Sequence, residues 1–569
     1  MTSILEIEIP RALDELVRDH SESGTWLEAW VFEDEPARRM AEAELAAAGV
    51  RARIRSAYKP LLHFFLEEVE LTGLSAVTIR TPSHSLAVEN RFRLEAYPLA
   101  GLLRGVLLRF EQGVDELHYV VATEHGSRRT EHRVFAPNRD RRNVLGEHAL
   151  APCGWARTAA DVQGKPLPTE YELAFDKVMA AVAGHPWKKT EPFFEVLEIA
   201  VETAGIEHRL SYGDEWVSTR EALHEDLYFS ILELFKSFHG LSPENRNLQI
   251  GQIVPDIRVG TGATKVRVAL RPGDRSTWED ASQSLESAAR PLSPAQIERE
   301  VVALGGTRFD VISGQGRAVV ATHIPGRGPG LLVSGGQHAN ETSGVVGALR
   351  AASVLQKKGT GFALIPQENP DGYALHGRLR RHNPRHMHHA ARFTALGDDL
   401  AFREKEPFGE TAARLEAFRR TDAVLHVNLH GYPAHEWTRP HSGYVPPRSA
   451  LWMIPKGFFL IMRHHPGLQA KAENFVRKLA ARVARVPGLK EFNEAHLASY
   501  AAHEGEMPHP IHDSIPCVVG ESPRFVPPFT LVAEYPDETI YEDAFRLAHT
   551  VQMTTVIEAA DLLASGELG

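Results

Sequence analysis

The carboxyl-terminal half of this chain is predicted to be an α/β domain in which helices flank a mixed or parallel sheet. From residue 307 onward, short apolar segments alternate with helical patterns, which is the order of strands and crossover helices. Several of these apolar segments end directly at a histidine or a carboxylate. The chain has 569 residues, more than one ordinary domain, so one or two smaller α/β or α+β accessory domains are expected before it.

Composition excludes several classes of protein. A hydrophobic content of 43% is enough for a sizeable core, but no apolar run approaches the roughly 20 residues that span a membrane. The net charge of −11 argues against nonspecific nucleic-acid binding, which depends on Lys and Arg neutralising phosphates. Two cysteines, Cys153 and Cys517, exclude a zinc–thiolate site and need no disulfide framework. We therefore expect a cytoplasmic protein, because the amino terminus lacks the features of a signal peptide.

Residues 1–190 are expected to form an accessory α+β domain. Residues 26–57 have the pattern of a strand, an Ala/Glu-rich helix and a second strand. Short alternating runs in residues 66–135 predict strands of an antiparallel or mixed sheet. Residues 136–195 are rich in Pro, Arg and Trp, so we predict loops with one helix near residues 171–183.

Residues 191–290 are expected to form a second accessory region and a linker. Strands are predicted at 194–201 and 264–270. Between them, a Ser-Thr-Arg-Glu capping box begins a helix over 218–238. His224 on this helix lies beside three carboxylates, which fits either a second metal or acid–base site or a solvated helix face; we favour the solvated face.

Residues 291–569 are expected to form the catalytic domain. A Ser-Pro signal begins its first helix near residue 294. Further helices are predicted at 343–357, 471–486 and 541–564. Strands are predicted at 309–313, 318–324, 330–333, 361–366, 425–429, 517–519 and 529–533.

Side chains that bind metals or transfer protons follow these strands. His338 and Glu341 come after a strand that ends in two glycines, and His430 and Glu534 end two later strands. Open α/β sheets build their sites at the carboxyl ends of strands, where these groups are expected to meet. His426 and His435 are alternatives to His430, and Glu521 to Glu534.

This order of motifs resembles the zinc carboxypeptidase family, the funnelin-type metallopeptidases, over residues 307–563. The matching segments are Gly-Gln-Gly-Arg at 314–317, His-Ala-Asn-Glu at 338–341, Asn-Pro-Asp-Gly at 369–372, His430-Gly431, and Phe-Thr-x-x-x-Glu ending at Glu534. The resemblance implies a carboxypeptidase-like mixed sheet. It also implies one zinc ion per chain, held by His338, Glu341 and His430.

The same resemblance implies two further catalytic residues. Glu534 is similar to the family's general base, which takes a proton from the metal-activated water. Arg392 begins a stretch similar to the family's Arg-x-Asn-x-x-Gly-x-Asp-Leu and is implied as the oxyanion arginine. Arg381, in Arg-x-Asn with Asn383, is a rival.

The chain departs from the family where the substrate carboxylate is gripped. Ala401 and Phe402 replace the family's Asn-Arg pair, and Arg403 is displaced by one position. Arg403 could bind substrate from that shifted register, because carboxylate recognition needs a well-placed guanidinium. Tyr500 is the candidate for the tyrosine that closes over substrate.

The sequence therefore predicts a zinc-dependent hydrolase of peptide or amide bonds, of metallocarboxypeptidase type. Two alternatives stay open: a deacylase or amidase of acylated amino acids or small amides, and a catalytically silent binding module. The expected partner is a peptide or acylated amino acid, with no nucleic acid and no membrane. A histidine cluster at residues 382–389 suggests a second metal site, but we favour a loop rim that contacts substrate, or plain surface.

Overall fold

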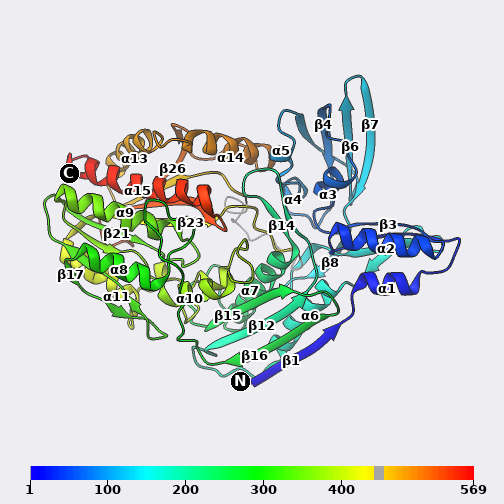
Figure 1. Ribbon diagram of the computed structural model, residues 1–569, viewed down its shortest axis with the longest axis horizontal. Helices are drawn as coiled ribbons and strands as arrows, with labels where there is room; N and C mark the ends of the chain where they lie inside the picture. Colours follow the sequence, from blue (N-terminus) through cyan, green and yellow to red (C-terminus); the bar gives the residue numbers. More distant parts are fainter. Residues whose placement is uncertain (1, 441–453, 569) are drawn as a thin grey trace.

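The structure is a computed structural model that describes residues 2–440 and 454–568. The fold is mixed α/β, with several sheets flanked by helices (Figure 1). A nine-stranded sheet, in the order β17-β20-β22-β21-β23-β27-β24-β26-β25, organises the carboxyl-terminal half. Its central strands β22, β21, β23 and β27 are parallel, and β24 runs antiparallel to β27. The strands are β17 Thr307–Arg308, β20 Thr322–Ile324, β21 Gly330–Gly335, β22 Phe362–Ile365, β23 Ala423–Pro433, β24 Phe459–His464, β25 Ile511–His512, β26 Ile515–Glu521 and β27 Phe529–Glu538.

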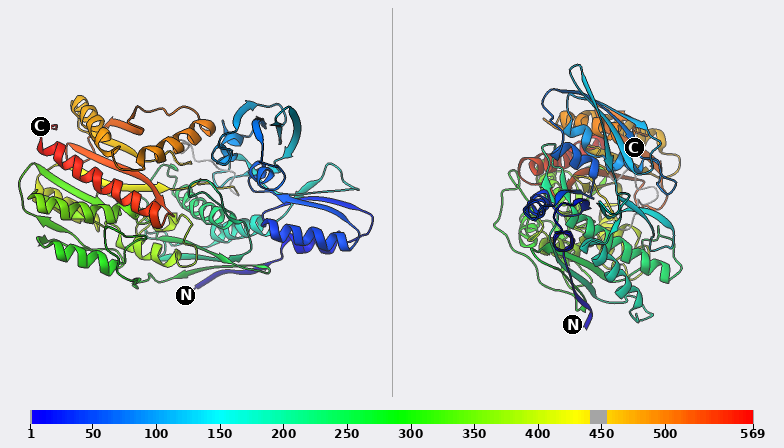
Figure 2. Two further views of the ribbon diagram at one scale, coloured as in Figure 1. Left: turned by 45° about the horizontal axis from the view of Figure 1, so that its top comes forward. Right: turned by 90° about the vertical axis from the view of Figure 1, so that its right-hand side faces the viewer.

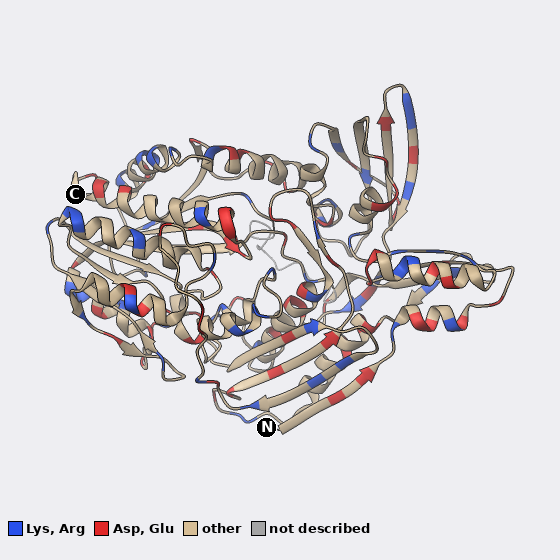
Figure 3. Ribbon diagram, viewed as in Figure 1, with Lys and Arg blue, Asp and Glu red and all other residues tan. Residues whose placement is uncertain are grey.

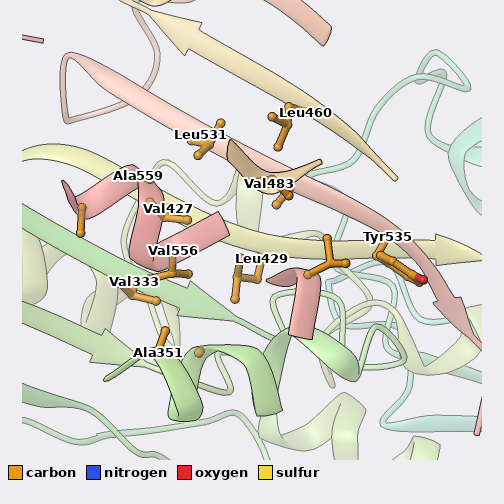
Figure 4. Close-up of a cluster of buried hydrophobic side chains, with 14 of the residues drawn as sticks. Val333, Ala351, Val427, Leu429, Leu460, Val483, Leu531, Tyr535, Val556 and Ala559 are labelled. Atoms are coloured by element: carbon orange, nitrogen blue, oxygen red, sulfur yellow. The ribbon is translucent and has the colours of Figure 1, made fainter. Parts of the chain in front are cut away.

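Helices pack against both faces of this sheet. On one face, Val333, Val427 and Leu531 from the strands join Ala351 of α9 and Val556 of α15 in one apolar core (Figure 4). Removing this apolar surface from water is the main source of stability. On the other face, α11 packs against β21 and β22. The helices of this half are α8 Pro294–Leu304, α9 Ser343–Lys358, α10 Pro370–Leu379, α11 Thr411–Thr421, α13 Gln469–Val483, α14 Leu489–His503 and α15 Glu542–Ala564.

The predicted strands and helices of the carboxyl-terminal half are present. The segment 309–313 contributes only the short β18 (Val311–Ile312), which pairs with β19 (Ala318–Val319) outside the main sheet. The segment 318–324 divides into β19 and β20. The strands β17, β24 and β25 and the helices α10, α11 and α14 were not predicted.

A four-stranded sheet, β1-β16-β12-β15, underlies the accessory region. Its first strand β1 pairs with β16, so residues 1–190 and 191–290 share one sheet. Helices α6 and α7 pack with its apolar residues. Oppositely charged residues face each other across β1 and β16, as Glu6 with Arg267 and Glu8 with Lys265 (Figure 3). The elements are β1 Thr2–Ile9, α6 Glu170–Gly184, β12 Val196–Thr203, α7 Thr219–Phe238, β15 Gln252–Val259 and β16 Thr264–Arg271.

Two further four-stranded sheets, β11-β10-β2-β3 and β5-β4-β6-β7, and a two-stranded sheet, β8-β9, lie in the amino-terminal region (Figure 2). The predicted strand, helix and strand of residues 26–57 are confirmed as β2, α2 and β3. The prediction of loops at 136–195 was wrong in part, because β8 to β11 lie there. These strands have three to five residues, and the first reads Asn-Arg-Asp-Arg-Arg, so they lack an alternating apolar pattern. The elements are α1 Ala12–Asp19, β2 Trp26–Val31, α2 Glu35–Ala47, β3 Arg51–Ser56, α3 Pro60–Glu67, β4 Leu74–Thr81, α4 Arg91–Glu95, α5 Leu99–Leu102, β5 Leu107–Gln112, β6 His118–His125, β7 Arg128–Phe135, β8 Asn138–Arg142, β9 His148–Pro152, β10 Gly154–Thr158 and β11 Lys165–Leu167.

The segment between β16 and α8 has no regular secondary structure but is anchored to the carboxyl-terminal half. Trp278 is buried against Tyr373 of α10, and its indole N–H donates to the Tyr373 carbonyl at 3.3 Å. No helix in the described part of the chain is long and apolar enough to cross a membrane.

Candidate metal centre

A glycine turn positions the first two residues of the site. Gly336 has a φ of +61°, and a Cβ there would lie 1.7 Å from Oε1 of Gln367, so this position requires glycine. The chain then passes His338 and Glu341 before α9 begins at Ser343. Both side chains consequently lie just beyond the carboxyl end of β21, a central parallel strand.

His338, Glu341 and His430 converge at this edge of the sheet. Nδ1 of His338 lies 2.8 Å from one Glu341 oxygen, and Nδ1 of His430 lies 3.0 Å from the other. The two imidazole Nδ1 atoms are 3.1 Å apart. All three residues are buried. Within the described residues, this is the one His/Cys/Asp/Glu group whose donor atoms are close enough to hold a metal ion.

The donor set of this group fits zinc. A catalytic zinc site takes three protein ligands from histidine and carboxylate and leaves one position open. Burial opposes ionisation of Glu341, but His338, Arg392 and His430 hold the pKa of its carboxyl well below the ordinary range. Burial lowers the pKa of His430, which favours the neutral imidazole that binds metals. The site thus presents an ionised carboxylate and two imidazoles to one point.

Glu534 lies beside the three candidate ligands. It is the register partner of His430 across β23 and β27, and it is 7% exposed. Its Oε2 atom has no hydrogen-bond partner among the described residues. Burial and the nearby Glu341 raise its pKa well above the ordinary value. Glu521, in contrast, ends the more distant β26 and is exposed.

Arg392 also reaches the centre. Its Nη1 atom lies 2.6 Å from Glu341 Oε1, and the pKa of Arg392 is raised by Glu341 and Asp399 even though burial opposes it. The guanidinium therefore stays charged beside the candidate ligands.

The structure places the other predicted substrate residues elsewhere. Arg403 is buried and its guanidinium pairs with Asp398 and Glu410, so those donors are not offered to a substrate. Arg381 is exposed, and the Asn383 side-chain amide donates to the Ile257 carbonyl at 2.6 Å.

Tyr500 likewise lies in a separate apolar cluster. This buried residue of α14 packs with Leu94 and Tyr97 of the accessory region and with Ile454. The structure therefore does not bring Tyr500 to the three candidate ligands.

The two alternatives to His430 have other partners. His426 is buried, and its Nε2 lies 2.7 Å from the Ser334 hydroxyl. His435 pairs instead with Glu221 of α7, with Nε2 2.7 Å from Oε2. Neither residue belongs to the converging group.

The prediction that the polar face of α7 is solvated was wrong. His224 and Glu225 are 3% and 0% exposed. Of the histidines predicted as a loop rim or plain surface, His382 is exposed. His389 instead packs against this helix, with its Nδ1 2.6 Å from Glu225 Oε2. His386 and His388 are buried as well. The sequence could not show this burial, because the segment that covers Glu225 lies more than 160 residues after it in the chain.

Asp399 is a residue of the site that the sequence did not single out as functional. Its Oδ1 lies 3.6 Å from Nε2 of His338, the ring nitrogen that points away from the candidate metal position. A carboxylate in this place orients an imidazole ligand and raises its basicity. The available signal was the Gly-Asp-Asp-Leu turn at 397–400.

Fold and site together define an α/β protein with a candidate metal centre at the carboxyl edge of its main sheet. No protein-family model matches the chain, and no curated protein matches it in sequence. Among solved structures, the chain is similar to a metallo-carboxypeptidase from Pseudomonas aeruginosa in complex with (2-guanidinoethylmercapto)succinic acid. That match has 17% identity and a TM-score of 0.30, and covers 54% of this chain and 76% of the other.

Two further solved structures show similar values. A metallo-carboxypeptidase from Burkholderia cenocepacia has 14% identity and a TM-score of 0.30, with 55% of this chain and 77% of the other covered. Bovine thrombin-activatable fibrinolysis inhibitor, in complex with tick carboxypeptidase inhibitor, has 12% identity and a TM-score of 0.30, with 50% and 100% covered.

Proposed function

We propose that this protein is a zinc-dependent hydrolase of peptide or amide bonds, with metallocarboxypeptidase as the reaction class. The observation that carries the proposal is the convergence of His338, Glu341 and His430. Glu534 lies beside them, because it is the register partner of His430 on the neighbouring strand β27. The motif resemblance to zinc carboxypeptidases supports the same roles.

Each residue has a defined task in this reaction. His338, Glu341 and His430 would hold zinc, which supplies Lewis-acid activation of water and of the scissile carbonyl. With zinc bound, whose charge favours the ionised carboxylate, Glu534 would use its unpartnered Oε2 to accept the proton of the attacking water and pass it to the leaving amine. The Arg392 guanidinium stabilises the oxyanion that develops on the carbonyl.

An amidase or deacylase is the second candidate. Ala401 and Phe402 carry no group that binds a carboxylate, and Arg403 is neutralised by Asp398 and Glu410. This segment therefore offers no free arginine to a terminal carboxylate, so cleavage need not depend on one, and a small amide or an acylated amino acid remains a candidate substrate.

The variant Glu534→Gln tests the proposed reaction. Wild-type protein is expected to hydrolyse members of a mixed peptide and acyl-amino-acid library, followed by mass spectrometry. Glu534→Gln should retain zinc but lose hydrolysis by about 10²–10⁴-fold, the usual contribution of a general base. Glu521→Gln is the matched control and should keep full activity. Undiminished turnover by Glu534→Gln would contradict the assigned role.

A further inference from the structure

Three arginines from separate segments lie near one another, and one of them, Arg246, lies near Asp399 of the candidate metal centre. Arg246 belongs to the loop between α7 and β15, Arg463 to β24, and Arg524 to the loop before β27. The guanidinium groups of Arg246 and Arg524 lie 5.3 and 4.3 Å from the ring centre of Phe402. Phe402 therefore serves as a shared platform for two cations. We call Arg246, Arg463 and Arg524 the arginine group.

The arginine group is connected to a candidate metal ligand through one carboxylate. Nη1 of Arg246 lies 3.7 Å from Asp399 Oδ2, and Asp399 Oδ1 lies 3.6 Å from Nε2 of His338. The backbone also joins them, because the Asp399 N–H donates to the Arg246 carbonyl at 3.3 Å. The accessory region thus places a cation one side chain away from the metal centre.

The positive charge of this group is not balanced. Asp399 is shared with His338, and the only other carboxylate at ion-pair distance in the described residues is Glu404, which is 58% exposed and 3.7 Å from Nε of Arg524. The side chains of Arg463 and Arg524 make no hydrogen bond within the described chain. The adjacent Arg403, in contrast, has two buried carboxylates of its own.

Electrostatic repulsion among the arginines also indicates that their positive charge is not balanced. Burial lowers the pKa of Arg246, and the nearby Arg392 and Arg524 lower it further. Burial and Arg524 lower the pKa of Arg463 in the same way. Like charges held together are unfavourable until an anion joins them. The arrangement is therefore suited to receive a negatively charged group.

We infer that the arginine group binds a carboxylate of the substrate, and that the protein prefers an acidic residue at the bond it cleaves. A guanidinium matches a carboxylate in charge and geometry. The guanidinium groups of Arg246 and Arg524 are positioned by the Phe402 ring and can bind the same carboxylate. This inference rests on the proposed function, since it assigns the substrate class of that site. The carboxylate could belong to an acidic side chain or to a free carboxyl terminus; the excess of cations favours the side chain.

Four blocked dipeptides test the inference: acetyl-Ala-Glu and acetyl-Ala-Gln, each with a free or an amidated carboxyl terminus. We expect kcat/KM to be at least about tenfold higher for Glu than for Gln, the factor of one charge-assisted hydrogen bond. Arg246→Gln and Arg524→Gln should each reduce this ratio severalfold. Arg419→Gln, which removes an exposed guanidinium of α11, is the matched control and should leave the ratio unchanged. Equal rates for Glu and Gln, with discrimination only by amidation, would overturn the acidic-residue inference.

A binding measurement separates this inference from the proposed reaction. Zinc-loaded Glu534→Gln is titrated with the same peptides by calorimetry. Tighter binding of the Glu peptides without turnover by the wild type would support the arginine group and contradict the hydrolase. Turnover without any preference for the Glu peptides would support the hydrolase and contradict the role of the arginine group. Absence of both binding preference and turnover would overturn both.

Discussion

His435 and Glu221 form a buried ion pair between α7 and the end of β23. The imidazole Nε2 lies 2.7 Å from the carboxylate, and its Nδ1 lies 3.3 Å from the Thr539 hydroxyl. Burial alone would lower the pKa of His435, but Glu221, with smaller contributions from Glu215 and Glu207, raises it to about 9. At neutral pH this histidine is therefore charged and holds the accessory helix to the catalytic half.

This pair predicts a pH dependence of stability. Because the pKa of His435 is raised in the folded protein, its stabilisation is fully present below about pH 6.5, the ordinary histidine pKa, and is lost as the pH rises to about 9. The shift corresponds to about 3 kcal/mol. Urea unfolding at pH 6 and pH 9 should show this loss in the wild type and not in His435→Gln. The exposed His382→Gln is the control; the same pH dependence in His435→Gln and in the wild type would contradict the assignment.

Among single residues, the sequence predicted those whose signal is local. His338 and Glu341 follow one strand and one glycine turn, so their shared position could be predicted. Arg246 and Glu221 could not be, because each acts on residues more than 150 positions away. The ion pairing of Arg403 could not be predicted for another reason. Its partners Asp398 and Glu410 are close to it in sequence, but nothing in their spacing showed that the three residues would be buried together.

At the scale of elements, α7 illustrates what periodicity can and cannot predict. Its capping box predicted the start, and Ser218 Oγ accepts a hydrogen bond from the Glu221 N–H at 3.0 Å. The apolar stripe predicted one buried face. The polar face is buried as well, because the segment around His389 covers it, and its carboxylates find histidine partners there. A polar helix face is solvated only when nothing else packs on it.

The cap of α7 gives a prediction for this element. Ser218 accepts from the backbone and also donates to Glu207 at 3.0 Å. Ser218→Ala is expected to destabilise the protein by about 1–2 kcal/mol, the range for loss of a helix cap, or somewhat more because the Glu207 contact is lost too. Ser293→Ala removes the cap of α8 and serves as the comparison, with about 1 kcal/mol expected. A smaller loss in Ser218→Ala than in Ser293→Ala, measured by urea unfolding, would contradict this account.

At the scale of the whole molecule, the accessory and catalytic parts share a core. Leu375 and Leu379 of α10 belong to the same apolar cluster as α7 and β15. Gly397 approaches the accessory chain so closely that a Cβ there would lie 2.4 Å from the Gly251 carbonyl oxygen. The sequence predicted the strand and helix order of each part, but it could not predict this contact, because periodicity shows which face is buried and not what buries it.

The shared core predicts that residues 291–569 do not form an active protein alone. Without the accessory part, the apolar side chains of α10 lose their partners and Arg246 is absent from the site. Expressed alone, this segment should aggregate or lack activity, and co-expression with residues 1–290 should restore soluble, active protein. Size-exclusion chromatography with an activity assay measures both. A monomeric, fully active 291–569 segment would contradict the prediction.

The central claim is that His338, Glu341 and His430 hold one zinc ion, and metal content tests it most directly. Protein purified without chelator and analysed by inductively coupled plasma mass spectrometry should contain about one zinc per chain, the content of a three-ligand catalytic site. His338→Ala and His430→Ala should lose it, whereas His426→Gln, on the same face of β23, should keep it. Folded wild-type protein that takes up no zinc, or His338→Ala and His430→Ala variants that bind it like the wild type, would contradict the account.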